Sequence, residues 1–87
     1  MGATRQELES LWRNRVRDAR IRLDFSRSYL DEVRQDRRSG AIPEADGDYA
    51  YRRALRADRD ALAEFRRVLR IFTELVVHGE VPNEKIS

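Results

Sequence analysis

The sequence predicts an all-α protein in which two long helices fold back on each other as an antiparallel hairpin (αα-hairpin). Three observations predict this fold class. Apolar residues recur at alternating spacings of three and four over two long segments, which is helical periodicity. Neither glycine nor proline interrupts the first segment between residues 4 and 39. The turn-rich stretch that joins the segments is short, which favours antiparallel neighbours.

Size and composition narrow the class of protein. We expect one helical-hairpin domain over residues 1–87. Charged residues make up 39% of the chain, yet the formal net charge is only +2, which disfavours a strong non-specific nucleic-acid binder. The absence of cysteine excludes disulfides and favours a cytoplasmic location. No apolar run suits a membrane span or a signal peptide, so we expect a soluble protein without membrane association.

The first helix is expected over about residues 4–39. Thr4 and Glu7 fit a capping box, in which the threonine hydroxyl accepts from the glutamate amide and the glutamate reaches back. Gly40 stands where a left-handed residue commonly ends a helix. These signals define both ends of the helix.

A loop is expected over about residues 40–46, and a second helix over about residues 47–78. Asp46 or Asp48 can cap the start of this helix, and we prefer Asp46. A glycine again supplies the C-terminal stop. A short C-terminal tail, residues 79–87, follows it.

Each predicted helix has a main apolar stripe. On the first helix it consists of Trp12, Val16, Ala19, Leu23, Ser26, Leu30 and Val33. On the second it consists of Tyr51, Leu55, Asp58, Leu62, Phe65, Leu69, Phe72 and Val76. Folding at the loop places residues whose numbers sum to about 85 opposite each other. Trp12 is then expected to meet Phe72 or Leu75.

A second stripe beside each main stripe remains uncovered in a hairpin of two helices. Ordering the chain costs more free energy than one apolar contact between helices easily offsets. We therefore expect two hairpins to pair as a homodimeric four-helix bundle, and the alternative is that the stripe docks on a different, unidentified protein. The candidate interaction surface comprises Leu11, Ile21, Phe25, Tyr29, Val68, Ile71 and Leu75.

Asp58 is the polar interruption of the second main stripe. A carboxylate in an apolar contact is costly unless it is paired. Ser26 is expected to donate to it across the hairpin and Arg22 to act as its counter-ion, which gives a polar core layer that fixes the register. The less favoured interpretation is a small anion or ligand pocket that also includes Arg15 and Tyr29.

Arginine supplies almost all of the positive charge, because Lys85 is the only lysine. Codon usage explains such a bias as readily as phosphate recognition does. The outer face of the second helix suggests an alternative function, a nucleic-acid-binding regulator. The plainer interpretation is a solvated face with pairs such as Arg56–Asp60. The candidate phosphate contacts are Arg52, Arg56, Arg59, Arg66 and Arg70.

Neither catalytic nor metal-ligand nor nucleotide-binding spacing appears in the sequence. No catalytic residue, metal site, cofactor or small-molecule substrate is therefore predicted. The expected function is that of a small, non-enzymatic protein–protein interaction or scaffold module. The sequence does not identify a partner.

Overall fold

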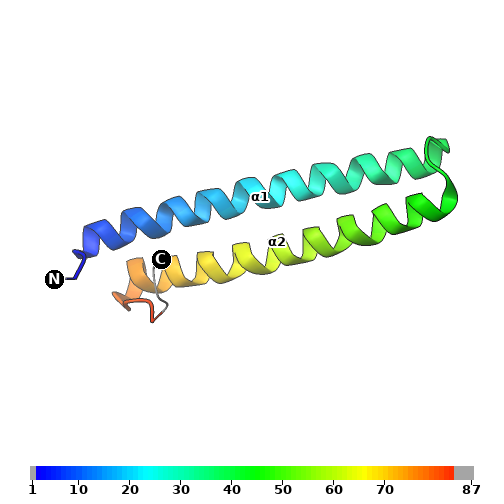
Figure 1. The fold of residues 1–87 in the computed structure, drawn as a ribbon. Helices are drawn as coiled ribbons and strands as arrows, with labels where there is room; N and C mark the ends of the chain where they lie inside the picture. Colours follow the sequence, from blue (N-terminus) through cyan, green and yellow to red (C-terminus); the bar gives the residue numbers. More distant parts are fainter. Residues whose placement is uncertain (1, 84–87) are drawn as a thin grey trace.

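The computed structural model describes residues 2–83 and is helical over 85% of these residues. Two helices, α1 (Arg5–Ser39) and α2 (Glu44–His78), pack along their lengths as an antiparallel hairpin. Figure 1 shows the start of α1 and the end of α2 at one end, with the connecting loop at the other. The predicted all-α hairpin is confirmed. Neither helix contains a segment long and apolar enough to cross a membrane, within the residues described.

Both ends of α1 follow the sequence signals. The Thr4 hydroxyl accepts a hydrogen bond from the Glu7 backbone N–H at 3.1 Å. The hydroxyl also donates to the Glu7 carboxylate, so the glutamate returns to the threonine side chain rather than to its backbone. Gly40 adopts the left-handed conformation with φ of 72° and donates to the Arg37 carbonyl. A residue with a Cβ is disfavoured at such a φ, which explains the glycine.

The start of α2 differs from the prediction. The helix begins at Glu44 after Pro43, three residues earlier than expected, and Asp46 lies in its first turn rather than at the cap. The fixed φ of proline suits the entry to a helix, and acidic side chains in the first turn suit the helix dipole. Gly47 therefore lies inside the helix, where it is buried. A Cβ at this position would lie only 3.2 Å from the Arg37 side chain, so a larger residue would require that side chain to shift.

Arg37 holds the loop end of the hairpin together. Its guanidinium donates to Asp48 at 2.6 Å and lies 4.6 Å from the centre of the Tyr51 ring. A second pair between the helices, Arg27 with Asp58 at 3.6 Å, lies farther along the hairpin. The residue numbers of both pairs sum to 85, so the predicted register is confirmed at these two positions.

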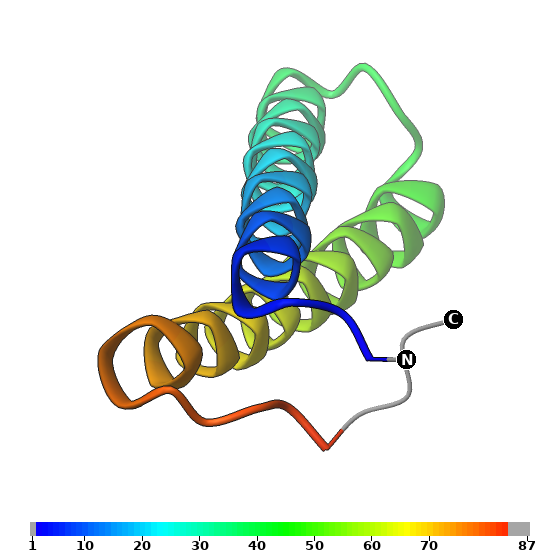
Figure 2. The ribbon, with the colours of Figure 1, turned by 90° about the vertical axis from the view of Figure 1, so that its left-hand side faces the viewer.

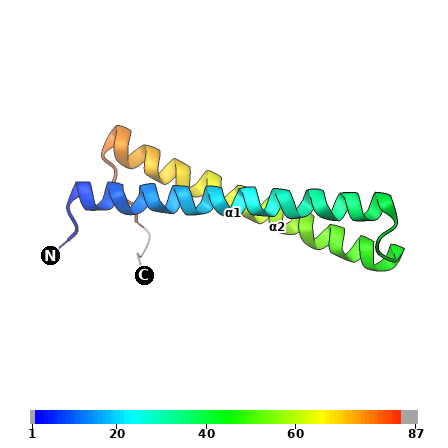
Figure 3. The ribbon, with the colours of Figure 1, turned by 90° about the horizontal axis from the view of Figure 1, so that it is seen from above.

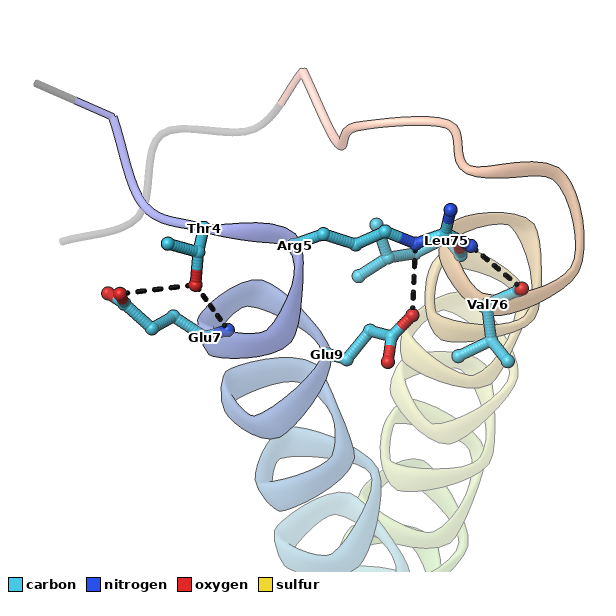
Figure 4. Close-up of polar contacts among 6 residues, drawn as sticks. All are labelled: Thr4, Arg5, Glu7, Glu9, Leu75 and Val76. Atoms are coloured by element: carbon cyan, nitrogen blue, oxygen red, sulfur yellow. Dashed lines mark hydrogen bonds and ion pairs between the residues drawn. The ribbon is translucent and has the colours of Figure 1, made fainter.

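Arg5 closes the open end of the hairpin. Its guanidinium donates to the backbone carbonyls of Leu75 and Val76 at 3.3 and 3.1 Å (Figure 4). The last carbonyls of a helix lack partners within the helix, so a cation there satisfies them and interacts favourably with the dipole. Nothing in the sequence pattern marked this arginine, because the contact joins residues 70 positions apart.

The buried core has one cluster near each end of the hairpin, and Ala19 and Leu23 of α1 are buried between the two clusters. Trp12, Val68 and Leu75 form one cluster near the open end. Leu30, Val33 and Ala54 form another near the loop. The helices splay apart toward both ends when viewed end-on (Figure 2), and their axes cross near the middle of the hairpin (Figure 3). The contact of Trp12 with Leu75 agrees with the predicted pairing.

The face of α2 that contacts α1 is rotated relative to the predicted main stripe. Its most buried residues, Ala54, Val68 and Leu75, all belong to the neighbouring stripe. Leu69 and Val76 from the predicted stripe remain 40% exposed. Since α2 has apolar residues on both adjacent heptad positions, its pattern alone did not determine which of them would face α1.

We expect Trp12 to dominate the stability of the open end. Its side chain is fully buried, yet its indole N–H has no hydrogen-bond partner among the described residues. Trp12→Ala should cost about 3–5 kcal/mol of unfolding free energy. Trp12→Phe should cost less than half as much, because it also removes the unsatisfied donor. Urea unfolding at one fixed chain concentration tests this, and equal costs for the two variants would contradict it.

Candidate interaction surface

A shallow groove of about 560 Å³ runs between the helices near the middle of the hairpin. The cyan part of α1 and the yellow-green part of α2, which form it, lie side by side in Figure 1. The groove exists because α2 contributes small side chains, Ala57 and Ala61, between the two core clusters. The side of the hairpin that contains it is called the groove face below. The groove is lined by Ala19, Ile21, Arg22, Phe25, Ser26, Ala57, Asp60, Ala61 and Glu64.

Large apolar side chains border this groove without cover. Phe25 is 76% exposed and Ile21 is 59% exposed. Leaving a phenylalanine ring in water forgoes about 1.5–3 kcal/mol relative to burying it. Apolar side chains beside a groove with polar rims are typical of a protein-binding surface.

The charged residues of the groove are divided by sign between the helices. Of the lining residues, α1 contributes the cationic Arg22, whereas α2 contributes the anionic Asp60 and Glu64. A hydrogen bond from Arg67 lowers the pKa of Glu64 below its ordinary value of 4.5. The positive charge of Arg22 acts in the same direction, while partial burial opposes it. Arg67 pairs with Glu64 at 2.8 Å and so neutralises most of its charge, which leaves Asp60 as the unpaired negative charge among the α2 residues that line the groove.

The opposite side of the hairpin is covered by the chain's own arginines. Arg13 lies 5.8 Å from the Phe72 ring centre and Arg34 lies 6.0 Å from that of Tyr51. Arg27 pairs with Asp58 between these two contacts. Positions 13, 27 and 34 differ by multiples of seven, so these three arginines share one face of α1. We call this side the arginine-covered face.

The structure corrects part of the predicted interaction surface. Val68 and Leu75 are 2% and 1% exposed because they pack against Trp12 within the chain. Neither is available to a partner, since the rotation of α2 places its second stripe inside the hairpin. Leu11 and Ile71 are partly buried against the same cluster.

Three predicted surface residues remain accessible. Ile21 and Phe25 line the groove. Tyr29, on the next turn of α1, is 44% exposed. The accessible part of the predicted surface therefore belongs to α1.

The predicted polar core layer does not assemble as expected. Asp58 pairs with Arg27 rather than with Arg22, and its buried Oδ1 accepts no hydrogen bond within residues 2–83. Ser26 and Arg22 instead line the groove, which Asp58 does not. Spacing in the sequence placed Asp58 correctly at the helix contact, but several arginines lay within one turn of its expected height. Arg27 and Arg22 lie on different sides of α1, and only the side that carries Arg27 faces Asp58.

The predicted phosphate contacts all lie on the exposed outer face of α2. Arg52 donates to the Asp48 backbone carbonyl at 3.5 Å. The pairing of Arg56 with Asp60 considered from the sequence is not formed, and the four arginines that follow Arg52 in this set make no ion pair within the described part of the chain. The outer arginine stripe, as we call it, consists of Arg52, Arg56, Arg59, Arg66 and Arg70.

A second hollow lies beside the loop and is explained by the ends of the helices. Arg34, Arg37 and Arg38 line it together with Tyr51. Arginines in the last turn of α1 stabilise the negative end of its dipole, and Arg37 is already bonded to Asp48. The arginines beside this hollow therefore have a structural role at the end of α1 and in the closure of the loop.

Within residues 2–83, no group of three or more histidine, cysteine, aspartate or glutamate side chains is placed to hold a metal ion. Comparison of the chain with protein-family models, curated proteins and solved structures found no match. The groove and the outer arginine stripe are thus interpreted from their own geometry and charge.

We expect Asp58→Leu to stabilise the chain by about 1 kcal/mol, because it replaces a partly buried carboxylate with an apolar side chain in an apolar contact. The matched control is Asp31→Leu, which removes an ion pair to Arg34 at a 70% exposed side chain and should change stability by less than about 0.5 kcal/mol. Urea unfolding compares the two. A loss of stability in Asp58→Leu would show that the pair with Arg27 is a net stabilising interaction.

Proposed function

We propose that this chain is a non-enzymatic protein–protein interaction or scaffold module that works as a homodimeric four-helix bundle. The main support is the groove face, where Phe25 is 76% exposed beside a groove floored by alanines. A hairpin of two helices buries one face of each helix, and a second hairpin is the economical way to cover what is left.

The distribution of buried residues also supports an assembly. Eight apolar residues are buried in the chain's own core, whereas eight large apolar side chains are exposed. Small domains of this size gain little stability from one thin core, and oligomerisation is a common remedy. The bundle would then present the outer faces of four helices to further partners.

The mass in solution tests the dimer. We expect light scattering to give about twice the mass of one 10.3 kDa chain at micromolar concentration, with dissociation on dilution that is coupled to loss of helical signal. A stable, folded monomer at every concentration would contradict the proposed homodimer.

A second candidate function rests on the outer arginine stripe. Positions 52, 56, 59, 66 and 70 follow one face of α2 over about 27 Å at 1.5 Å per residue. Arg59 and Arg66 belong to the set without ion pairs, so their charges are not neutralised locally. A regulator that binds nucleic-acid phosphates would use such a stripe. The net charge of only +2 places this second.

A salt series tests the second candidate. If the stripe binds phosphates, fluorescence anisotropy should show a labelled duplex binding at low salt. The plot of log affinity against log salt has a negative slope, and its magnitude should decrease by about two units in Arg59→Gln/Arg66→Gln. Arg17→Gln/Arg20→Gln is the control, since it removes the same charge from α1 and should leave the slope unchanged. Absence of binding at low salt would exclude this function.

A further inference from the structure

We infer that the occupant of the groove face is a second copy of this chain, with α1 of each copy lying over α2 of its partner. The inference rests on the proposed homodimer and adds the face, the helix pairing and the residues that make the contact. In this arrangement Phe25 of each copy fills the hollow over Ala57 and Ala61 of the other. Each contact therefore occurs twice, as two-fold symmetry requires.

The charges of the groove select this pairing of helices. Stacking α1 on the partner's α1 would bring the two copies of Arg22 together, and stacking α2 on α2 would bring the two copies of Asp60 together. Only α1 on the partner's α2 brings Arg22 to Asp60. Neither residue forms an ion pair inside the described chain, and Arg22 acts on Glu64 through its charge without pairing with it, so both groups can form an ion pair with the partner. Complementary potentials of this kind determine orientation and exclude wrong partners.

The shape of the groove agrees with the same occupant. Its residues lie near the middle of both helices, close to where the helix axes cross in Figure 3. Since α1 and α2 each have 35 residues, two copies that meet at their middles overlap along their whole length. Phe25 projects from α1 at the same height at which Ala57 and Ala61 leave the hollow in α2. The knob and its hole are therefore in matching register.

The size of the hairpin is compatible with an interface of standard area. The hairpin extends over 57 × 18 × 17 Å. One long side, 57 × 18 Å, offers about 1,000 Å² to a copy that overlaps it fully. Standard interfaces bury roughly 800 Å² on each partner. The projected area of one long side is thus on the scale of a standard interface.

The arginine-covered face is the weaker candidate for the interface. Its aromatic side chains are already in contact with arginines of the same chain at Phe72 and Tyr51. A copy docking there would have to displace or bury these guanidinium groups, which is costly for charges without new partners. Leu69, at 40% exposed, is the apolar residue on that face that allows a matched comparison.

The first test compares one substitution on each face by analytical ultracentrifugation of the full chain. Phe25→Glu should raise the dimer dissociation constant by at least about 100-fold, because a central buried contact is lost twice. Leu69→Glu should change it by less than about threefold. Circular dichroism checks that both variants keep their helices, which the exposure of both positions favours. Dissociation by Leu69→Glu instead of Phe25→Glu would overturn the choice of face.

The second test is a charge swap. Arg22→Glu alone and Asp60→Arg alone should each weaken the homodimer at least about tenfold, because each places two like-charge contacts in the interface. Mixed together, the two variants should form a heterodimer as tight as the wild-type homodimer, since one of its contacts is native and the other is reversed. Native mass spectrometry distinguishes the species by mass. A mixture without preference for the heterodimer would overturn the pairing of α1 with α2.

These outcomes separate the inference from the proposed function. A wild-type chain that is monomeric at every concentration would contradict the homodimer itself. A wild-type dimer that tolerates Phe25→Glu would keep the homodimer and overturn only the arrangement inferred here. A dimer that requires Phe25 and prefers the charge-swapped partner supports both.

Discussion

Within residues 2–83 each helix packs against only one other helix, and the limited burial that this provides determines the rest of the structure. Trp12 and the residues around it seal the open end, and a smaller cluster around Ala54 seals the loop end. Between the clusters, the side chains of Ala57 and Ala61 on α2 are too small to fill the space between the helices, which leaves the groove. The hairpin is therefore well packed at its ends and open on one side of its middle.

The two sides of the hairpin differ in how far their apolar side chains are shielded from water. On one side, arginines from α1 extend over the aromatic residues of α2, so the apolar surface is shielded by the methylene stems and guanidinium planes of the same chain. On the other side, Arg15 lies over the Trp12 ring near the open end, whereas Phe25, near the middle of the hairpin, stands uncovered beside the groove. An arginine can shield its own chain but brings its charge with it, whereas a phenylalanine requires an apolar partner. This difference is the physical basis for assigning the groove face to assembly.

The sequence predicted the hairpin, the glycine stops and the contact face of α1, because helical periodicity and end signals are local. It did not predict the start of α2, where Pro43 and a buried Gly47 depend on the packing of Arg37. It also assigned Val68 and Leu75 to the interaction surface, although both are core residues and Leu75 was at the same time expected opposite Trp12. Adjacent apolar stripes on α2 are equivalent in sequence, so the pattern did not distinguish the stripe that packs against Trp12 in the closed hairpin. The role of Arg5 at the end of α2 likewise depends on the closed hairpin.

The central claim is that Phe25 of one copy packs on Ala57 and Ala61 of another. Isotope-filtered NMR on a mixture of ¹³C-labelled and unlabelled chains tests it most directly, because only contacts between copies give signals. We expect nuclear Overhauser effects from the Phe25 ring of the labelled copy to the methyl groups of Ala57 and Ala61 of the unlabelled one. Contacts between copies that involve Leu69 and Val76, with none from Phe25, would contradict it.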